Sequence, residues 1–110
     1  MQVLRDADRF GAEPGGAPGW VEHLRAADLS VGTYSIPAGG VDTQDPHSED
    51  EVYVVLRGRA TFVAGDAVAD VAPGTAIYVP AREPHRFEDI IEDLVAIVLF
   101  APAEGARAGQ

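Results

Sequence analysis

The stretch GGVDTQDPHSEDEVYVVLRG, residues 39–58, decides the fold of this 110-residue chain. Its first half is acidic and polar, whereas VYVVL at 52–56 is β-branched and aromatic, which is typical of a buried strand. His47 and Glu51 are four residues apart on this extended segment. Because strand side chains alternate between faces, both should point the same way. An imidazole and a carboxylate so placed could converge on one cation.

Two neighbours of His47 are further candidate ligands. Asp45 lies two residues earlier and would share its face, whereas Gln44 would do so only if Pro46 marks a bulge. The spacing alone is weak evidence, because His-x-x-x-Glu arises often by chance and an acidic run is usually a solvated loop. A calcium loop is a further option, but EF-hand spacing is missing and histidine is a poor calcium ligand.

A second stretch, GTAIYVPAREPHRFED at 74–89, supplies another histidine. His85 follows a loop made rigid by Pro80 and Pro84. If its segment lies beside the first stretch, His47, Glu51 and His85 form a face of two histidines and one carboxylate. Such a face suits Fe(II), Mn(II), Zn(II) or similar metals and leaves positions open for water or substrate.

The rest of the chain predicts short strands separated by glycine- and proline-containing turns. No amphipathic helix, internal repeat or linker is evident, so a single all-β domain with a closed or sandwiched antiparallel architecture is expected, its core at about residues 20–101. Residues 1–19 and 102–110 are expected to be a flexible lead-in and tail. The predicted strands are 20–25, 29–36, 52–56, 60–63, 67–71, 77–79, 85–87 and 95–100.

Composition excludes several classes of function. The chain has no cysteine and no lysine, which excludes thiolate catalysis, iron–sulfur clusters and Schiff-base chemistry. Its net charge of −10 argues against binding to nucleic acids and to anionic membranes. The longest apolar stretch, 94–101, is too short to span a bilayer, and the charged N-terminus does not resemble a signal peptide. We therefore expect a cytoplasmic protein.

Both stretches resemble the two motifs of the cupin superfamily. The first motif is Gly, five residues, His-x-His, three or four residues, Glu, six residues, Gly. The second is Gly, five residues, Pro-x-Gly, two residues, His, three residues, Asn. Fifteen residues separate the two stretches, and the resemblance covers 39–89. The matching positions are Gly39, His47, Glu51 and Gly58 in the first motif, and Gly74, Pro80 and His85 in the second.

This resemblance implies a double-stranded β-helix, or jelly-roll barrel, and a ligand set for one divalent metal ion such as Fe, Mn, Zn or Ni. Carried over residue by residue, the ligands are His47, Glu51 and His85. The chain departs from the motifs at Asp45, which replaces the first histidine, and also at Arg82 and Asp89. Asp45 or Gln44 could supply a fourth ligand, or the set could end at three. The alternative is a metal-free pocket in which the same residues form hydrogen bonds.

Three tyrosines are candidates for catalytic roles. Alternation from Glu51 places Tyr53 and Val55 on the inner face of their strand, and Tyr34 and Tyr78 are further candidates to face the pocket. A tyrosine hydroxyl beside a metal could act as an acid, a base or an orienting donor. Equally, these rings could pack the barrel and place their hydroxyls at its rim.

The resemblance implies a metal-dependent enzyme whose small-molecule substrate chelates the metal. The two-histidine, one-carboxylate face favours an oxygenase, and isomerase, decarboxylase and cyclase reactions remain open. The main alternative is a barrel that binds or senses a sugar or other metabolite without catalysis, and another is a degenerate barrel kept only for assembly. The resemblance also implies a homodimer, for which 20–36 is the candidate interface.

Overall fold

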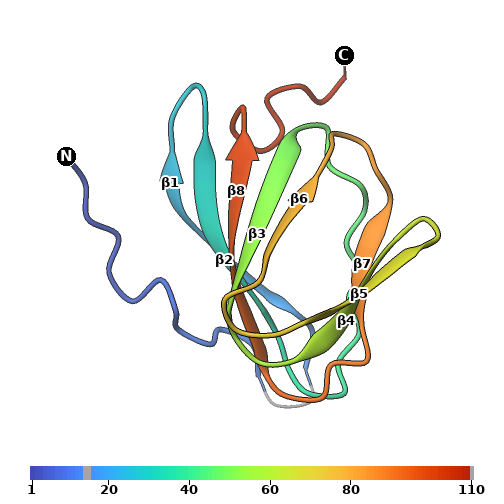
Figure 1. Cartoon of the computed structure of the whole chain (residues 1–110). Coiled ribbons are helices and arrows are strands. Elements are labelled where there is room, and N and C mark those ends of the chain that lie inside the picture. The colour runs from blue at the N-terminus through green and yellow to red at the C-terminus, as the bar shows by residue number, and fades with distance from the viewer. Residues whose placement is uncertain (14–15, 110) are drawn as a thin grey trace.

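Eight antiparallel strands form two sheets that face each other (Figure 1). The computed structural model describes residues 1–13 and 16–109, and within these ranges there is no helix. One sheet has five strands in the order β1-β2-β8-β3-β6, and the other has three in the order β5-β4-β7. The strands are β1 (Gly19–Arg25), β2 (Ser30–Ile36), β3 (Asp50–Arg57), β4 (Ala60–Ala64), β5 (Ala67–Val71), β6 (Ala76–Val79), β7 (His85–Glu88) and β8 (Leu94–Ala101).

Each predicted strand has a counterpart whose ends differ from the prediction by at most two residues, so the all-β jelly-roll prediction is confirmed. No helix in the described ranges has the length and apolar character needed to span a bilayer. β1 is an edge strand of the larger sheet, and the predicted dimerisation through this region remains a prediction.

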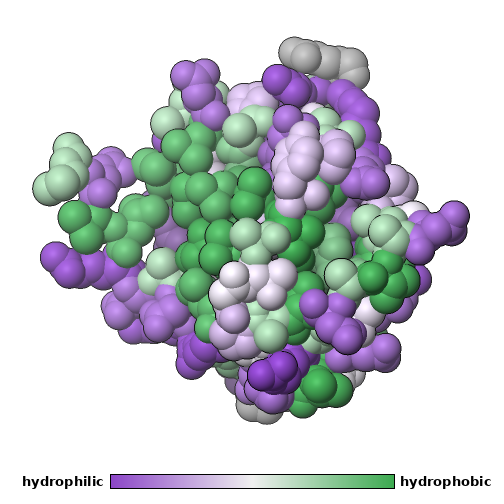
Figure 2. Space-filling view, in the orientation of Figure 1, coloured by the Kyte–Doolittle hydropathy of each residue, from purple (hydrophilic) through white to green (hydrophobic). Residues whose placement is uncertain are grey.

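Strand β3 is the central element for the site because its side chains alternate between core and surface. Glu51, Tyr53 and Val55 point into the barrel, as predicted. Inside, the Tyr53 ring packs edge-on against Phe87, with 5.1 Å between centroids, and Phe62 packs against Phe87 at 4.9 Å. Figure 2 shows apolar residues gathered over the strands and polar residues toward the periphery of the same view. This aromatic core also contacts the buried His85 ring, whose centroid is 5.9 Å from that of Tyr53 and 5.8 Å from that of Phe62.

Both end segments make hydrogen bonds to the sheets. In the lead-in, the Gly11 amide donates to Ser35 Oγ at 3.0 Å, and residues 14 and 15 lie outside the described residues. In the tail, the Glu104 amide donates to Ser30 Oγ at 2.9 Å, and residue 110 is outside the described part. The expected flexibility of these segments remains a prediction, but the tail reaches the same end of the barrel as the start of β3.

Gly58 joins β3 to β4 in a conformation that other residues rarely adopt, with φ of +92°. A Cβ at this position would overlap the Asp93 carbonyl oxygen and lie 2.7 Å from Leu94 Cα. We expect Gly58→Ala to lower the free energy of unfolding by roughly 2–3 kcal/mol. Urea denaturation measures the change.

Gly65→Ala is the matched control for this prediction. Gly65 also has a positive φ, of +58°, but a Cβ there would have nothing within 4 Å. Its substitution should therefore add backbone strain alone, about 1 kcal/mol. Equal losses of unfolding free energy in the two variants would show that steric overlap at position 58 adds nothing to the cost of backbone strain.

Candidate metal centre

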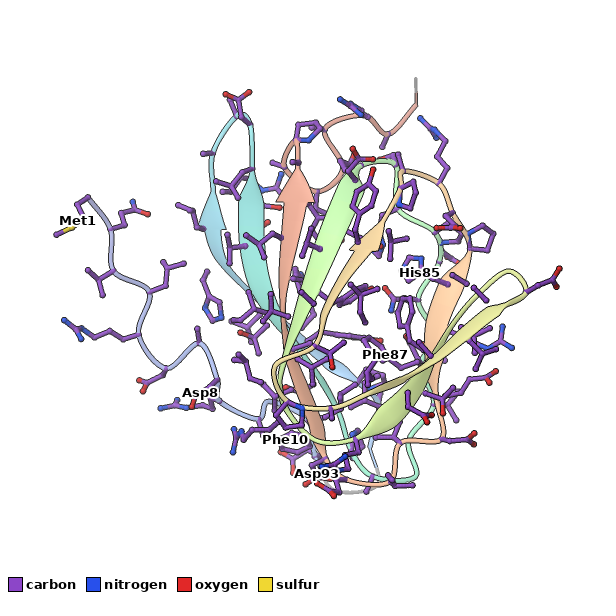
Figure 3. All side chains as sticks on the ribbon, in the orientation of Figure 1. Met1, Asp8, Phe10, His85, Phe87 and Asp93 are labelled. Carbon is purple, nitrogen blue, oxygen red and sulfur yellow. The ribbon has the colours of Figure 1, made fainter. Side chains whose placement is uncertain are left out.

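Three side chains from separate segments meet inside the barrel. His47 precedes β3, Glu51 is the second residue of β3, and His85 is the first residue of β7. Figure 3 shows His85 and Phe87 on β7 directed into the space between the sheets. One ligand atom from each of the three residues lies within 4.8 Å of the others. The predicted convergence of His47, Glu51 and His85 is confirmed.

The two motif loops are joined by backbone contacts that fix these positions. The Arg82 amide donates to the His47 carbonyl at 2.7 Å, and the Ala81 amide donates to Asp50 Oδ1 at 2.8 Å. Arg82 occupies the motif position of glycine and keeps a positive φ of +69°. The departure from the motif therefore leaves the turn before His85 in place.

Each histidine has an oxygen beside the ring nitrogen that faces away from Glu51. His85 Nδ1 donates to the Glu83 carbonyl at 2.8 Å, and because a carbonyl only accepts, Nε2 retains its lone pair in the neutral ring. That Nε2 is 2.8 Å from Glu51 Oε1. For His47, Nε2 lies 3.3 Å from Glu104 Oε2, and Nδ1 lies 3.4 Å from Glu51 Oε1. Such outer oxygens orient histidines that ligate metals.

Two buried polar atoms at the cluster have no hydrogen-bond partner among the described residues: His47 Nδ1 and Glu51 Oε2. A buried polar atom without a partner costs about 1–3 kcal/mol, so such atoms call for an explanation. A divalent ion would engage both atoms, together with His85. Two imidazole nitrogens and a carboxylate oxygen also match the donor preference of Fe, Mn, Zn and Ni. The residues present therefore fit a metal ion.

The cluster is electrostatically coupled. Burial lowers the pKa of His47 and His85, but the adjacent Glu51 carboxylate outweighs burial, so both pKa values lie above the ordinary value. Burial alone would raise the pKa of Glu51, and the two histidines reverse this and hold it below its usual value. Without metal, the histidines therefore keep protons to a higher pH than ordinary histidines do.

Metal binding should consequently weaken as the pH falls. A metal needs neutral imidazoles and must displace these protons, and each protonated histidine costs about tenfold in affinity per pH unit below its pKa. Because both pKa values are raised, the loss should begin above the pH at which free histidine titrates. Zn²⁺ and Mn²⁺ titrations between about pH 6 and 8 test this. An affinity independent of pH would show that the histidines are not ligands.

The two candidates for a fourth ligand have different positions. Residues 41–47 are not part of a strand, so the alternation that placed Asp45 beside His47 does not apply. Asp45 is exposed and outside the cluster, and the prediction that it faces the metal is wrong. Gln44 lies near the cluster, but its side chain is engaged: Nε2 donates to Asp42 Oδ2 at 2.8 Å, and Oε1 accepts from the Tyr53 hydroxyl at 3.0 Å. Its role as a ligand remains a prediction.

Two of the three tyrosines face the site. Tyr53 is 1% exposed, and its hydroxyl lies 3.0 Å from His85 Nε2. Tyr34 donates to Asp42 Oδ1 at 2.6 Å. Burial, and in Tyr34 the hydrogen bond to Asp42, raises both pKa values far above the usual range, so both hydroxyls stay protonated at neutral pH.

Tyr78 does not face the site, and the prediction that it does is wrong. It is 61% exposed. Val79 is the residue of β6 that pairs with inward-facing Glu51 of β3, so its neighbour Tyr78 must point outward. The sequence left the register between β3 and β6 open, and this pairing resolves it.

Three carboxylates were missed by the sequence interpretation. Asp42 is 7% exposed and accepts from Tyr34, Gln44 and the Phe87 amide, the last at 2.9 Å. Glu49 is 1% exposed and accepts from two backbone amides of the tail. Glu104 lies in the segment predicted to be a loose tail. The spacing of Asp42 and Glu49 within an acidic run gives no signal that distinguishes them from their exposed neighbours.

A cavity of about 160 Å³ opens beside the cluster. It is large enough for a small molecule or several waters. His47, a member of the cluster, and Tyr53, whose hydroxyl lies 3.0 Å from His85 Nε2, both line it. Its walls are formed by Trp20, Tyr34, Gln44, His47, Tyr53, Val98, Phe100 and Glu104.

Comparison with known proteins agrees with this architecture. The family model described as "Cupin domain" matches residues 32–101. This chain is a cupin. An uncharacterized protein of Streptomyces coelicolor is 43% identical to this cupin over 105 residues, covering 94% of the chain and 99% of the relative.

Two solved structures show the same fold at low identity. KdgF from Halomonas sp. has a TM-score of 0.71 and 24% identity, covering 84% of each chain. The DMSP lyase DddQ from Ruegeria pomeroyi has a TM-score of 0.72 and 21% identity over 92% of this cupin, which spans 54% of the lyase chain. At these identities the likeness is evidence for the fold alone.

Proposed function

We propose that this cupin is a metal-dependent enzyme acting on a small molecule that chelates a divalent cation held by His47, Glu51 and His85. The observation that carries the proposal is the pair of buried, unpartnered ligand atoms, His47 Nδ1 and Glu51 Oε2, beside a cavity open to a small molecule. When bound, the cation would act as a Lewis acid on a carbonyl or carboxylate oxygen of the substrate.

We propose that Tyr53 moves a proton at this site. It lines the cavity, and its hydroxyl is 3.0 Å from a ligand nitrogen, His85 Nε2. The Tyr53 hydroxyl donates a hydrogen bond to Gln44 Oε1, and Gln44 Nε2 donates in turn to Asp42 Oδ2. Because burial keeps Tyr53 protonated, its hydroxyl can act on a bound substrate as a hydrogen-bond or proton donor and not as a base.

This arrangement favours proton-transfer reactions such as isomerisation or elimination. The sequence alone favoured oxygen chemistry, because two histidines and one carboxylate are typical of iron oxygenases. The hydroxyl network beside the ligands adds an acid–base function that an oxygenase does not require.

The test begins with elemental analysis of protein purified without added metal. The protein loaded with Fe²⁺, Mn²⁺, Zn²⁺ or Ni²⁺ is then incubated in D₂O with small keto acids, hydroxy acids and uronic acids. NMR follows exchange of carbon-bound hydrogen, and an electrode follows dioxygen. Exchange or turnover without dioxygen uptake supports the proposal, whereas substrate-dependent uptake would assign an oxygenase. Tight binding of a compound without exchange or turnover would assign a binding barrel.

Tyr53→Phe should lower the rate of exchange or turnover by about 10²–10⁴-fold, because it removes the proposed proton donor and keeps the ring. Metal content should stay unchanged, because the hydroxyl is not among the three proposed ligands. Tyr78→Phe is the matched control, since Tyr78 is exposed on the outer face, and it should leave the rate unchanged. A Tyr53→Phe protein of full activity would remove Tyr53 from the reaction.

A further inference from the structure

The cavity beside the metal cluster has aromatic walls and a carboxylate. The rings of Trp20, Tyr34, Tyr53 and Phe100 line it together with Glu104. The Trp20 ring stands edge-on to Phe100, with 6.1 Å between centroids. None of the eight arginines belongs to this lining in the described part of the chain, and the chain has no lysine. An anionic substrate group would find no permanently charged cation on these walls.

Trp20 is held in its place by a glycine on the neighbouring strand. β1 and β2 pair so that the indole lies across Gly32, where a Cβ would overlap the indole ring. The ring is 39% exposed and forms part of the cavity wall. The absence of a side chain at Gly32 therefore leaves room for the indole at the side of the cavity.

Negative charge surrounds this aromatic wall. The Glu104 carboxylate lines the cavity, with its Oε2 3.3 Å from His47 Nε2, and Glu22 and Glu49 are its acidic neighbours. The nearest guanidinium, that of Arg25, is engaged by Glu22 at 2.7 Å and by the Glu104 backbone carbonyl at 2.9 Å. Behind the Tyr34 ring, the Tyr34 hydroxyl donates to the buried Asp42 carboxylate. With His47 neutral, as metal binding requires, the charged groups around this cavity are mainly carboxylates, and their field favours a cation.

We propose that the aromatic part of this cavity binds the positively charged end of the substrate, a small substituted ammonium group. Aromatic faces attract such cations through their quadrupoles, and a nearby carboxylate adds a charge that a neutral group of the same shape cannot use. The inference rests on the proposed function for the other end of the substrate, which chelates the metal. The substrate class is then a small molecule with a chelating oxygen group at one end and a substituted ammonium at the other.

The single tryptophan of the chain makes the test direct, because Trp20 is both the reporter and part of the wall. Metal-free protein, at a pH at which an NMR titration shows His47 to be neutral, is titrated with choline chloride, with its neutral isostere 3,3-dimethyl-1-butanol and with sodium acetate. Ionic strength is held constant, and Trp20 fluorescence is recorded. We expect saturable binding of choline, with the isostere at least about tenfold weaker. Acetate should leave the fluorescence unchanged.

Two variants locate the binding site. Glu104→Gln removes the charge and Phe100→Leu removes a ring, and each should weaken choline binding by about fivefold or more. Glu92→Gln is the charge-matched control: Glu92 pairs with Arg59 on the surface at 3.7 Å, and its loss should leave choline binding unchanged. Trp20→Leu removes the fluorescent reporter, so its affinity for choline is measured by calorimetry and compared with that of the unmodified protein.

The possible outcomes separate this inference from the proposed function. Equal affinity for the neutral isostere, tighter binding of acetate, or no saturable signal with choline would overturn the cation site, whatever the metal content. Choline binding by protein that takes up no metal would sustain the cation site and refute the metal-dependent enzyme. Choline binding unaffected by both Glu104→Gln and Phe100→Leu would place the cation elsewhere and refute the assignment to this cavity.

Discussion

Replacing His85 with alanine is expected to abolish metal binding while leaving the barrel folded. The variant leaves His47 and Glu51, two ligands where three converge, so affinity should fall by more than about 100-fold. The barrel should persist because the variant keeps the aromatic side chains of the core, Tyr53, Phe62 and Phe87. Elemental analysis and circular dichroism of the purified variant measure the two effects.

The third histidine of the chain provides the matched control. His23 lies on β1, and its Nε2 is 2.6 Å from Thr33 Oγ1 on β2, outside the cluster. His23→Ala should therefore retain metal at the level of the unmodified protein. Full metal occupancy in both His47→Ala and His85→Ala would end the assignment of a metal centre here.

Replacing Asp42 with alanine is expected to cause the largest loss of stability of any single substitution considered. The carboxylate accepts from the Tyr34 hydroxyl at 2.6 Å, from Gln44 Nε2 at 2.8 Å and from the Phe87 amide at 2.9 Å. Removing it leaves these three donors, and the Gln44 backbone amide 3.3 Å from Oδ1, unpaired in or near the core, each costing up to about 1–3 kcal/mol. We expect the free energy of unfolding to fall by about 3–5 kcal/mol, as measured by urea denaturation.

Asp45→Ala is the control for this experiment, because it removes a carboxylate three residues away that is exposed. Its effect should be within about 0.5 kcal/mol. The Asp42 variant should also free the Gln44 amide to rotate, which would release the Tyr53 hydroxyl from its present acceptor. A loss below about 1 kcal/mol for Asp42→Ala would show that water satisfies these donors instead.

The sequence predicted the fold because turn residues and short apolar runs alternate along most of the chain. The same alternation placed Glu51 and Tyr53 inside correctly, since both lie within the continuous strand β3. It failed for Asp45, which lies in a segment without strand pairing, where the side-chain direction is set by loop contacts and not by a period of two. The convergence of His47, Glu51 and His85 was predicted because the motif spacing extends across the irregular segment.

Residues that depend on tertiary pairing could not be predicted in the same way. The direction of Tyr78 follows from its register with β3, which no local pattern specifies. Asp42 and Glu49 are buried because distant groups, the Phe87 amide and the tail amides, approach them. Glu104 reaches His47 only because the tail returns to the barrel after β8. Contacts between segments far apart in the chain decided each of these positions.

The anchoring of the tail by Glu49 has a practical consequence for anyone who prepares this protein. The amides of Gly105 and Arg107 donate to the two Glu49 oxygens at 2.8 and 2.9 Å. A truncation that ends at Ala101 would retain every proposed ligand. It would also remove Glu104 from the cavity wall and leave the buried Glu49 carboxylate without its two amide donors. An affinity tag attached directly after residue 107 would disturb the same two hydrogen bonds to Glu49. Expression vectors for ligand screening should therefore preserve this segment and carry the tag at the opposite terminus.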